Sequence, residues 1–159
     1  MDRRGFTLIE VLIYSVLLAV GVLTLATVYR ASVETRSFIA AESALIANRR
    51  TAETLIRDRL SEATGVVTPA SGSSATLVLT SPVPAESPVT FALSDGALTM
   101  QLGAGDVAPI TGSDVTVTSF TATRRDGIPA SVLVEIGWSE GAFGATITDE
   151  SRLTATLRL

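Results

Sequence analysis

The side chains that most often perform catalysis or bind transition metals are missing from this sequence. Its 159 residues include no histidine and no cysteine, which removes the commonest general base, the thiolate nucleophile and the usual zinc ligands. The sequence also has no phosphate-binding glycine loop and no Gly-x-Ser-x-Gly nucleophile motif. It therefore predicts a protein that is not an enzyme and that uses no cofactor and no disulfide framework.

Carboxylates are the remaining groups that could hold a ligand, and calcium is the ion that they would suit. The candidates fall in segments that we expect to be loops: Asp95, Asp106, Asp114, Asp126 and the adjacent Asp149 and Glu150. Several of them stand beside glycine, and acidic residues next to glycine are typical of tight turns. We therefore expect ordinary turn carboxylates and no metal site.

The charge balance argues against a nucleic-acid-binding surface. The formal net charge is −4, with twelve arginines and no lysine. Arg124 and Arg125 form a short basic segment, expected to be a solvated turn, but two charges add little affinity for DNA at physiological salt. Nucleic acid is therefore not an expected partner. Trp138, the only tryptophan, is expected to fill the core or a sheet face.

One carboxylate stands where a charge is costly. Phe6–Tyr29 is an apolar run of 24 residues whose only charged residue is Glu10. As a helix this run would be about 36 Å long, enough to cross the hydrocarbon core of a bilayer. A carboxylate in such a span costs about 2.5 to 3.5 kcal/mol near the bilayer centre and less near its end. Glu10 either lies close enough to the interface to avoid this cost or has a function that compensates for it.

The residues around Glu10 resemble the leader and cleavage junction of type IV prepilins and pseudopilins. The string is Arg3-Arg4-Gly5-Phe6-Thr7-Leu8-Ile9-Glu10. The resemblance implies that a prepilin peptidase cuts after Gly5 on the cytoplasmic side and methylates the new N-terminal residue, Phe6. Glu10 then occupies the place of the family glutamate, the fifth mature residue.

This resemblance gives the apolar run a role in assembly. In a fibre, Glu10 of one subunit would pair with the α-amino group of Phe6 on its neighbour, which is cationic at neutral pH. Such a pair sets axial register better than it adds net stability. The implied partners are prepilin peptidase, other pilin or pseudopilin subunits, an inner-membrane assembly platform, and membrane lipid before assembly.

The stretch 30–63 contains no glycine or proline and predicts an amphipathic helix continuous with the apolar run. Gly65 and Pro69 are expected to end it. The joined helix would have about 57 residues and a length of about 85 Å. A coiled coil is a poor alternative, because alanine would stand in its seam. The apolar positions are spaced at helical intervals: Val33, Phe38, Ile39, Leu45, Ile46, Ala52, Leu55, Ile56 and Leu60.

Beyond Pro69 the pattern changes to short alternating runs after a Ser/Gly-rich loop at 70–74. Turns are expected at 94–96, 124–127 and 139–141. The pattern predicts one antiparallel sheet of about five to seven strands, with one face on the helical stripe and the other rich in Thr and Ser. The expected strands are Ala75–Thr80, Val89–Leu93, Ala97–Leu102, Val115–Thr123, Ser131–Trp138, Phe143–Thr148 and Arg152–Leu159.

The predicted fold class is therefore α+β and pilin-like. A long N-terminal helix, transmembrane in its lower half and amphipathic in its upper half, packs on a C-terminal antiparallel β-sheet. The expected divisions are a cytoplasmic leader at 1–5, a transmembrane and assembly helix at 6–29, the amphipathic helix of a globular domain at 30–63, and the sheet domain at 64–159.

The resemblance implies a structural subunit of a type IV pilus or a type II secretion pseudopilus. The lack of cysteine favours a minor subunit, because it excludes the disulfide loop frequent in this family. Residues 49–63 also resemble the helix end of J-type minor pseudopilins. A DNA-uptake (competence) pseudopilin and a single-pass anchored binding domain that does not assemble are the alternatives.

The predicted location is the cytoplasmic (inner) membrane. Arg3 and Arg4 before the single span favour a cytoplasmic N-terminus. The globular domain would then lie outside the cytoplasm, and the subunit could enter a surface or periplasmic fibre.

Overall fold

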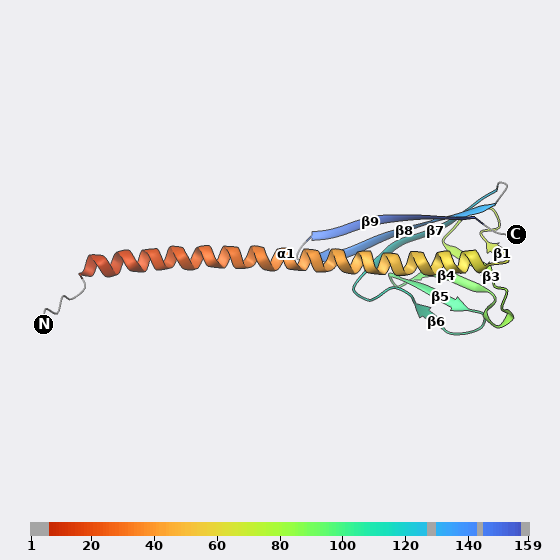
Figure 1. Ribbon diagram of the computed structural model, residues 1–159, viewed down its shortest axis with the longest axis horizontal. Helices are drawn as coiled ribbons and strands as arrows, with labels where there is room; N and C mark the ends of the chain where they lie inside the picture. The colour runs from red at the N-terminus through yellow and green to blue at the C-terminus, as the bar shows by residue number, and fades with distance from the viewer. Residues whose placement is uncertain (1–6, 127–129, 143–144, 157–159) are drawn as a thin grey trace. The chain divides into compact units, whose positions relative to one another are not determined.

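The computed structural model describes residues 7–126, 130–142 and 145–156 and shows one long helix followed by antiparallel strands (Figure 1). It has the predicted α+β, pilin-like arrangement, with the helix packed on antiparallel sheets. The elements in chain order are α1 (Leu8–Glu62), β1 (Gly65–Thr68), β2 (Gly72–Ser74), β3 (Thr76–Thr80), the 3₁₀ turn η1 (Pro84–Glu86), β4 (Val89–Ser94), β5 (Ala97–Leu102), β6 (Val107–Pro109), β7 (Thr116–Arg125), β8 (Ser131–Ala142) and β9 (Ala145–Thr156).

The chain divides into two compact units, and α1 contributes residues to both. We call residues 1–39 the tail unit and residues 40–159 the head unit. Every described residue of the tail unit is exposed except Glu10, Val33 and Ser37, which are half-buried. Burial in α1 begins at Ala41, so the change from an all-exposed helix to a packed one falls at the start of the head unit. The division into leader, span, helix and sheet domain at 5, 29 and 63 stays a prediction.

The end of α1 is fixed by the head unit. Ala63 N–H still donates to Arg59 carbonyl at 3.0 Å, whereas Thr64 N–H donates to Thr80 carbonyl on β3 at 2.9 Å. Arg59 lies in the last turn, where a cation interacts favourably with the helix dipole, and its Nη1 lies 3.0 Å from Glu86 Oε2. The chain therefore passes directly from the helix into the first sheet.

The head unit contains two sheets, and the prediction of one sheet was wrong. The first has the strand order β1-β3-β4-β5-β6 and the second β2-β7-β8-β9, all antiparallel. The strands β1, β2 and β6 have only three or four residues each. Segments this short carry no readable alternation, and β2 falls in the stretch 70–74 that was expected to be a loop. Their strand state comes from their partners in the sheet.

The long strands β7, β8 and β9 correct further local predictions. The expected turn at 139–141 lies inside β8, which runs through to Ala142. Asp149 and Glu150, expected in a loop, lie inside β9, where they pair with Trp138 and Gly137. The expected basic turn at Arg124 and Arg125 is the end of β7. In each case the pairing of a long strand overrides a local turn signal. Phe143 and residues 157–159 lie outside the described residues.

One hydrophobic core joins α1 to both sheets. Trp138 is buried in it, as predicted, and its indole Nε1–H donates to Ser151 Oγ at 3.0 Å, which satisfies its only polar group. The core residues include Leu45, Ala52, Ile56 and Leu60 from α1, Leu77, Leu79, Phe91 and Leu98 from the first sheet, and Val117, Phe120, Val132, Val134, Ile136 and Leu153 from the second.

Substitution of Ile56 tests whether this packing holds the head unit together. Ile56 is fully buried, so Ile56→Ala should lower the free energy of unfolding by about 2 to 5 kcal/mol through lost burial and a cavity. Ile46 is 36% exposed on the same helix, and Ile46→Ala should cost much less. Thermal unfolding of the full chain in detergent, followed by tryptophan fluorescence, measures both. Equal destabilisation by the two variants would contradict this description of the core.

Candidate functional site

The first turn of α1 is built by Thr7 and Glu10. Thr7 carbonyl accepts hydrogen bonds from Glu10 N–H at 3.1 Å and Val11 N–H at 3.2 Å. Thr7 Oγ1 also lies 3.4 Å from Glu10 N. Thr7 is thus the N-cap residue and Glu10 the third helical residue, the Thr-x-x-Glu spacing of a capping box. Sequence reasoning gave Glu10 a role in assembly only and missed Thr7, although this spacing is visible in the sequence.

Glu10 is suited to this place on electrostatic grounds as well. A carboxylate in the first turn interacts favourably with the positive end of the helix dipole. The side chain is half-buried, whereas the residues around it are exposed. Gly5 and Phe6, like Arg3 and Arg4, lie outside the described residues. The cleavage site at Gly5 and Phe6, the methylation of Phe6 and the pairing of Glu10 therefore stay predictions.

From Leu8 to Tyr29 the tail unit presents an apolar surface on all sides. Its large apolar side chains are between 53% (Ile13) and 86% (Leu8) exposed from Leu8 to Tyr29. α1 is long and apolar enough to cross a membrane: its most apolar 18-residue window has a mean hydropathy of 2.5, and none of that window is buried. The core helix of a soluble protein would be mostly buried. This surface instead suits a lipid or protein environment.

Three hydroxyl groups of this surface, those of Ser15, Thr24 and Thr27, donate hydrogen bonds within the helix. Ser15 Oγ donates towards the carbonyls of Val11 and Leu12, each at 2.9 Å. Thr24 Oγ1 donates to Val20 carbonyl at 2.9 Å, and Thr27 to Thr24 carbonyl at 2.8 Å. Because these donors need no water, the segment carries a low cost for entering an apolar medium.

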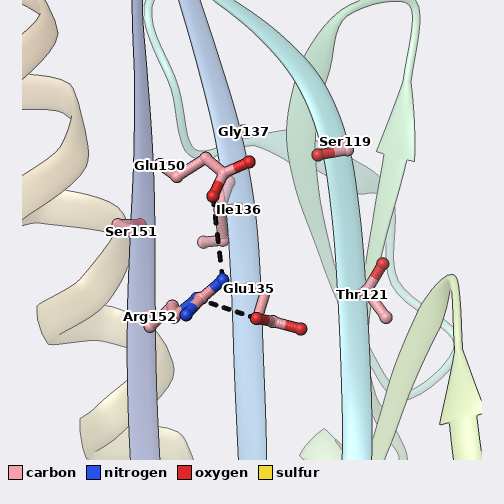
Figure 2. Close-up of a pocket in the computed structure, with 8 residues that line it drawn as sticks. All are labelled: Ser119, Thr121, Glu135, Ile136, Gly137, Glu150, Ser151 and Arg152. Carbon is pink, nitrogen blue, oxygen red and sulfur yellow. Dashed lines mark ion pairs between the residues drawn. The ribbon is translucent and has the colours of Figure 1, made fainter.

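The head unit carries a polar hollow on the face of the second sheet opposite to the core. Figure 2 shows Arg152 of β9 beside Glu135 of β8 and Glu150 of β9. Arg152 Nε lies 2.9 Å from Glu135 Oε1, and Arg152 Nη2 lies 3.9 Å from Glu150 Oε2. The hollow has a volume of about 190 Å³ and is lined by Ser119, Thr121, Glu135, Ile136, Gly137, Glu150, Ser151 and Arg152.

A β-bulge shapes this hollow. Val117 pairs with Trp138 and Ser119 with Gly137, so Thr118 is the extra residue of β7. A Cβ atom on Gly137 would lie 2.5 Å from Ser119 Oγ and 2.6 Å from Thr118 Oγ1. A side chain at position 137 would therefore require these two hydroxyl groups to rotate away. The charge of Arg152 in this hollow is compensated by the carboxylates of Glu135 and Glu150.

The structure does not bring the predicted loop carboxylates together. Asp95 lies in the turn between β4 and β5 with a φ of 50°. Asp149 Oδ2 lies 2.5 Å from Arg49 Nη1 of α1, and Asp126 Oδ1 lies 3.4 Å from Arg124 Nε. Within residues 7–126, 130–142 and 145–156, no group of three or more acidic residues is placed to hold a metal ion.

Comparison with known families adds one finding, and it concerns the same segment. Residues 1–26 match the model of the prokaryotic N-terminal methylation motif. This span contains Gly5, Phe6, Thr7 and Glu10 and extends into the apolar part of α1. It supports a type IV prepilin-like, membrane-anchored protein that prepilin peptidase processes and that assembles with other pilins. No curated protein and no solved structure matches the chain.

The N-cap role of Thr7 can be tested directly. Thr7→Ala removes the hydroxyl acceptor and should destabilise the first turn by about 1 kcal/mol, which raises amide exchange at Glu10 and Val11 about fivefold. Thr7→Ser keeps the acceptor and should leave exchange unchanged. Hydrogen exchange of the full chain in detergent micelles, read residue by residue, measures the effect. Unchanged exchange in Thr7→Ala would show that Thr7 does not cap the helix.

Proposed function

We propose that this chain is a minor structural subunit of a type IV pilus or a type II secretion pseudopilus. One observation carries the proposal: the methylation motif at 1–26 leads directly into a capped helix whose apolar surface is exposed on all sides. A fibre subunit needs these features in this order. The peptidase needs the motif, and the membrane and then the fibre need the apolar helix.

Cleavage after Gly5 would place the new N-terminus beside the helix start. Phe6 would then carry the α-amino group, one residue before the N-cap residue Thr7, and its methylation would leave that amine cationic. Glu10 of one subunit would pair with the Phe6 amine of its neighbour. In an apolar fibre interior both charges lose hydration, so an isolated charge is strongly disfavoured and the paired register is selected. Glu10 would thus both favour the helix start and set the position of the next subunit.

The same segment supports a membrane topology. Before cleavage, Arg3 and Arg4 precede the apolar helix and would hold the N-terminus in the cytoplasm. The head unit would then lie on the opposite side of the inner membrane. An assembly platform in that membrane would extract the subunit into a surface or periplasmic fibre.

The construction of the head unit supports a minor subunit. With no cysteine in the chain, its last described strand is held without a disulfide, by pairing with β8 from Ala145 to Thr156 and by the packing of Leu153 in the core. The J-type subclass rests on the helix end at 49–63. In that segment Arg49 and Arg59 bind Asp149 of β9 and Glu86 of η1.

Replacement of Glu10 tests the proposed assembly role. Glu10→Leu removes the charge that selects the register, so the subunit should still insert into the membrane but enter the sheared fibre fraction about tenfold less. Glu42 is an exposed acidic residue of the same helix, and Glu42→Leu should be incorporated normally. Immunoblots of membrane and fibre fractions measure both. Normal incorporation of Glu10→Leu would contradict the proposed role.

A further inference from the structure

In the described part of the head unit, three of the four edge strands are short, and the fourth, β9, is long. The edge strands are β1 and β6 of the first sheet and β2 and β9 of the second. β1 has four residues and a register shift, β2 has three, and β6 has three and ends in Pro109. Short, irregular or proline-containing edges resist pairing with another chain. β9 has twelve residues, from Ala145 to Thr156, without a bulge.

A single hydrogen bond shows which residues of β9 face its open side. Glu150 N–H donates at 2.9 Å to Asp149 Oδ1, an acceptor on its own strand. In an antiparallel pair the N–H and C=O of one residue point to the same side, and alternate residues point to opposite sides. The even-numbered residues of β9 therefore direct their backbone groups to the open edge. Among the described residues, the Asp149 carboxylate is the only group bonded to a donor of this edge.

These edge-facing residues form a self-complementary sequence. Thr lies at both ends, Glu150 and Arg152 lie at the centre, and the pattern is symmetric about Ser151. All six side chains are exposed, and Figure 2 shows Glu150 and Arg152 on β9 at the side of the hollow. The six residues in order are Thr146, Thr148, Glu150, Arg152, Thr154 and Thr156.

We propose that β9 pairs antiparallel with β9 of a second copy of this chain, with Ser151 opposite Ser151. This register places Glu150 opposite Arg152 of the second copy, and the reverse, so two opposite-charge pairs form across the twofold axis. Threonine lies opposite threonine at the remaining positions. Opposite charges and Thr–Thr pairs are favourable cross-strand neighbours. In each of these pairs, both residues direct their backbone N–H and C=O groups to the open edge, so the two strands can exchange hydrogen bonds.

The charges on β9 are available for this exchange. Glu150 is 79% exposed and lies 3.9 Å from Arg152, whereas Arg152 is 68% exposed and lies 2.9 Å from Glu135. Pairing needs only rotation of exposed side chains and release of Glu150 N–H from Asp149. Asp149 keeps its ion pair with Arg49. A shift of register by two residues would place Glu150 opposite Glu150 of the second copy, so the charges select one register.

The twofold axis makes the two copies run in opposite directions. Within the head unit, residues 40–62 of α1 run alongside β9 (Figure 1), so the α1 segments of the two head units would also be antiparallel. The pairing thus joins head units that approach from opposite directions and is distinct from the contact between successive subunits. It does not depend on cleavage, methylation or the proposed fibre.

Cross-linking tests the register, because the natural chain has no cysteine. Full-length Thr148→Cys and Thr154→Cys chains are mixed in detergent micelles, where orientation is not restricted, and oxidised. The proposed register puts these two positions opposite each other at about 5.5 Å between Cα atoms, within disulfide range. The mixture should give at least about tenfold more dimer than either variant alone. In this register residue 148 of one copy lies about 20 Å from residue 148 of the other, and the same holds for residue 154.

A matched control is the mixture of Thr148→Cys with Thr146→Cys, which the register separates by about 27 Å. This mixture should give only the background of the single variants. Equal dimer in both mixtures would overturn the proposal, and so would efficient cross-linking of Thr148→Cys with itself, which indicates parallel pairing. Absence of the cross-link in the Thr148→Cys and Thr154→Cys mixture would overturn it too.

Charge exchange in the Thr148→Cys and Thr154→Cys pair tests the interaction itself. Glu150→Arg alone, or Arg152→Glu alone, places like charges opposite each other twice and should reduce cross-linking about tenfold. The double variant E150R/R152E restores opposite charges and should recover the cross-link. Melting temperatures confirm that each variant is folded. Equal cross-linking in both single variants and the parent, or no recovery in a folded double variant, would contradict the proposal.

Discussion

The structure depends on where the apolar surface of a single helix can be covered. From Leu8 to Tyr29 α1 carries a single charged residue, Glu10, and is otherwise apolar on all sides, and none of its side chains there is fully buried. From Ala41 onward the helix buries one stripe against two sheets. The chain itself buries the apolar stripe of α1 in the head unit, but it does not bury the apolar surface of α1 in the tail unit. The tail unit therefore needs a membrane or other subunits as its surroundings, and the head unit does not.

Charge placement follows from the same constraint. The tail unit has internal hydrogen bonds for Ser15, Thr24 and Thr27. Glu10, the one acidic residue between Phe6 and Tyr29, stands in the first turn, where the helix dipole favours it. In the head unit, by contrast, Arg49 and Arg59 connect α1 to β9 and η1. These partly exposed pairs add little stability individually. They link α1 to β9 and η1 within the head unit, whose core packing supplies its stability and whose strands have no disulfide to hold them.

The sequence predicted most reliably the features that depend on local periodicity. The continuous helix, which ends at Glu62, and the strand Ala97–Leu102 follow from spacing within one segment. The division into two sheets does not, because β1, β2 and β6 are too short to show a pattern and exist only through their partners. The turn expected at 139–141 was wrong for a related reason: β9 pairs along the full length of β8 and keeps Gly141 in the strand. In the candidate site, the motif identified Glu10. The N-cap role of Thr7 could have been predicted from the Thr-x-x-Glu spacing. The roles of Gly5 and Phe6 remain predictions from the motif.

The central claim is that the first five residues are removed and that the chain then begins at Phe6. Intact-mass and peptide mass spectrometry of the mature protein from its native membrane tests this most directly. The account predicts an N-terminal peptide that starts with a singly N-methylated Phe6 and lacks residues 1–5. A mature chain that keeps Met1 and the intact Gly5–Phe6 bond would contradict it.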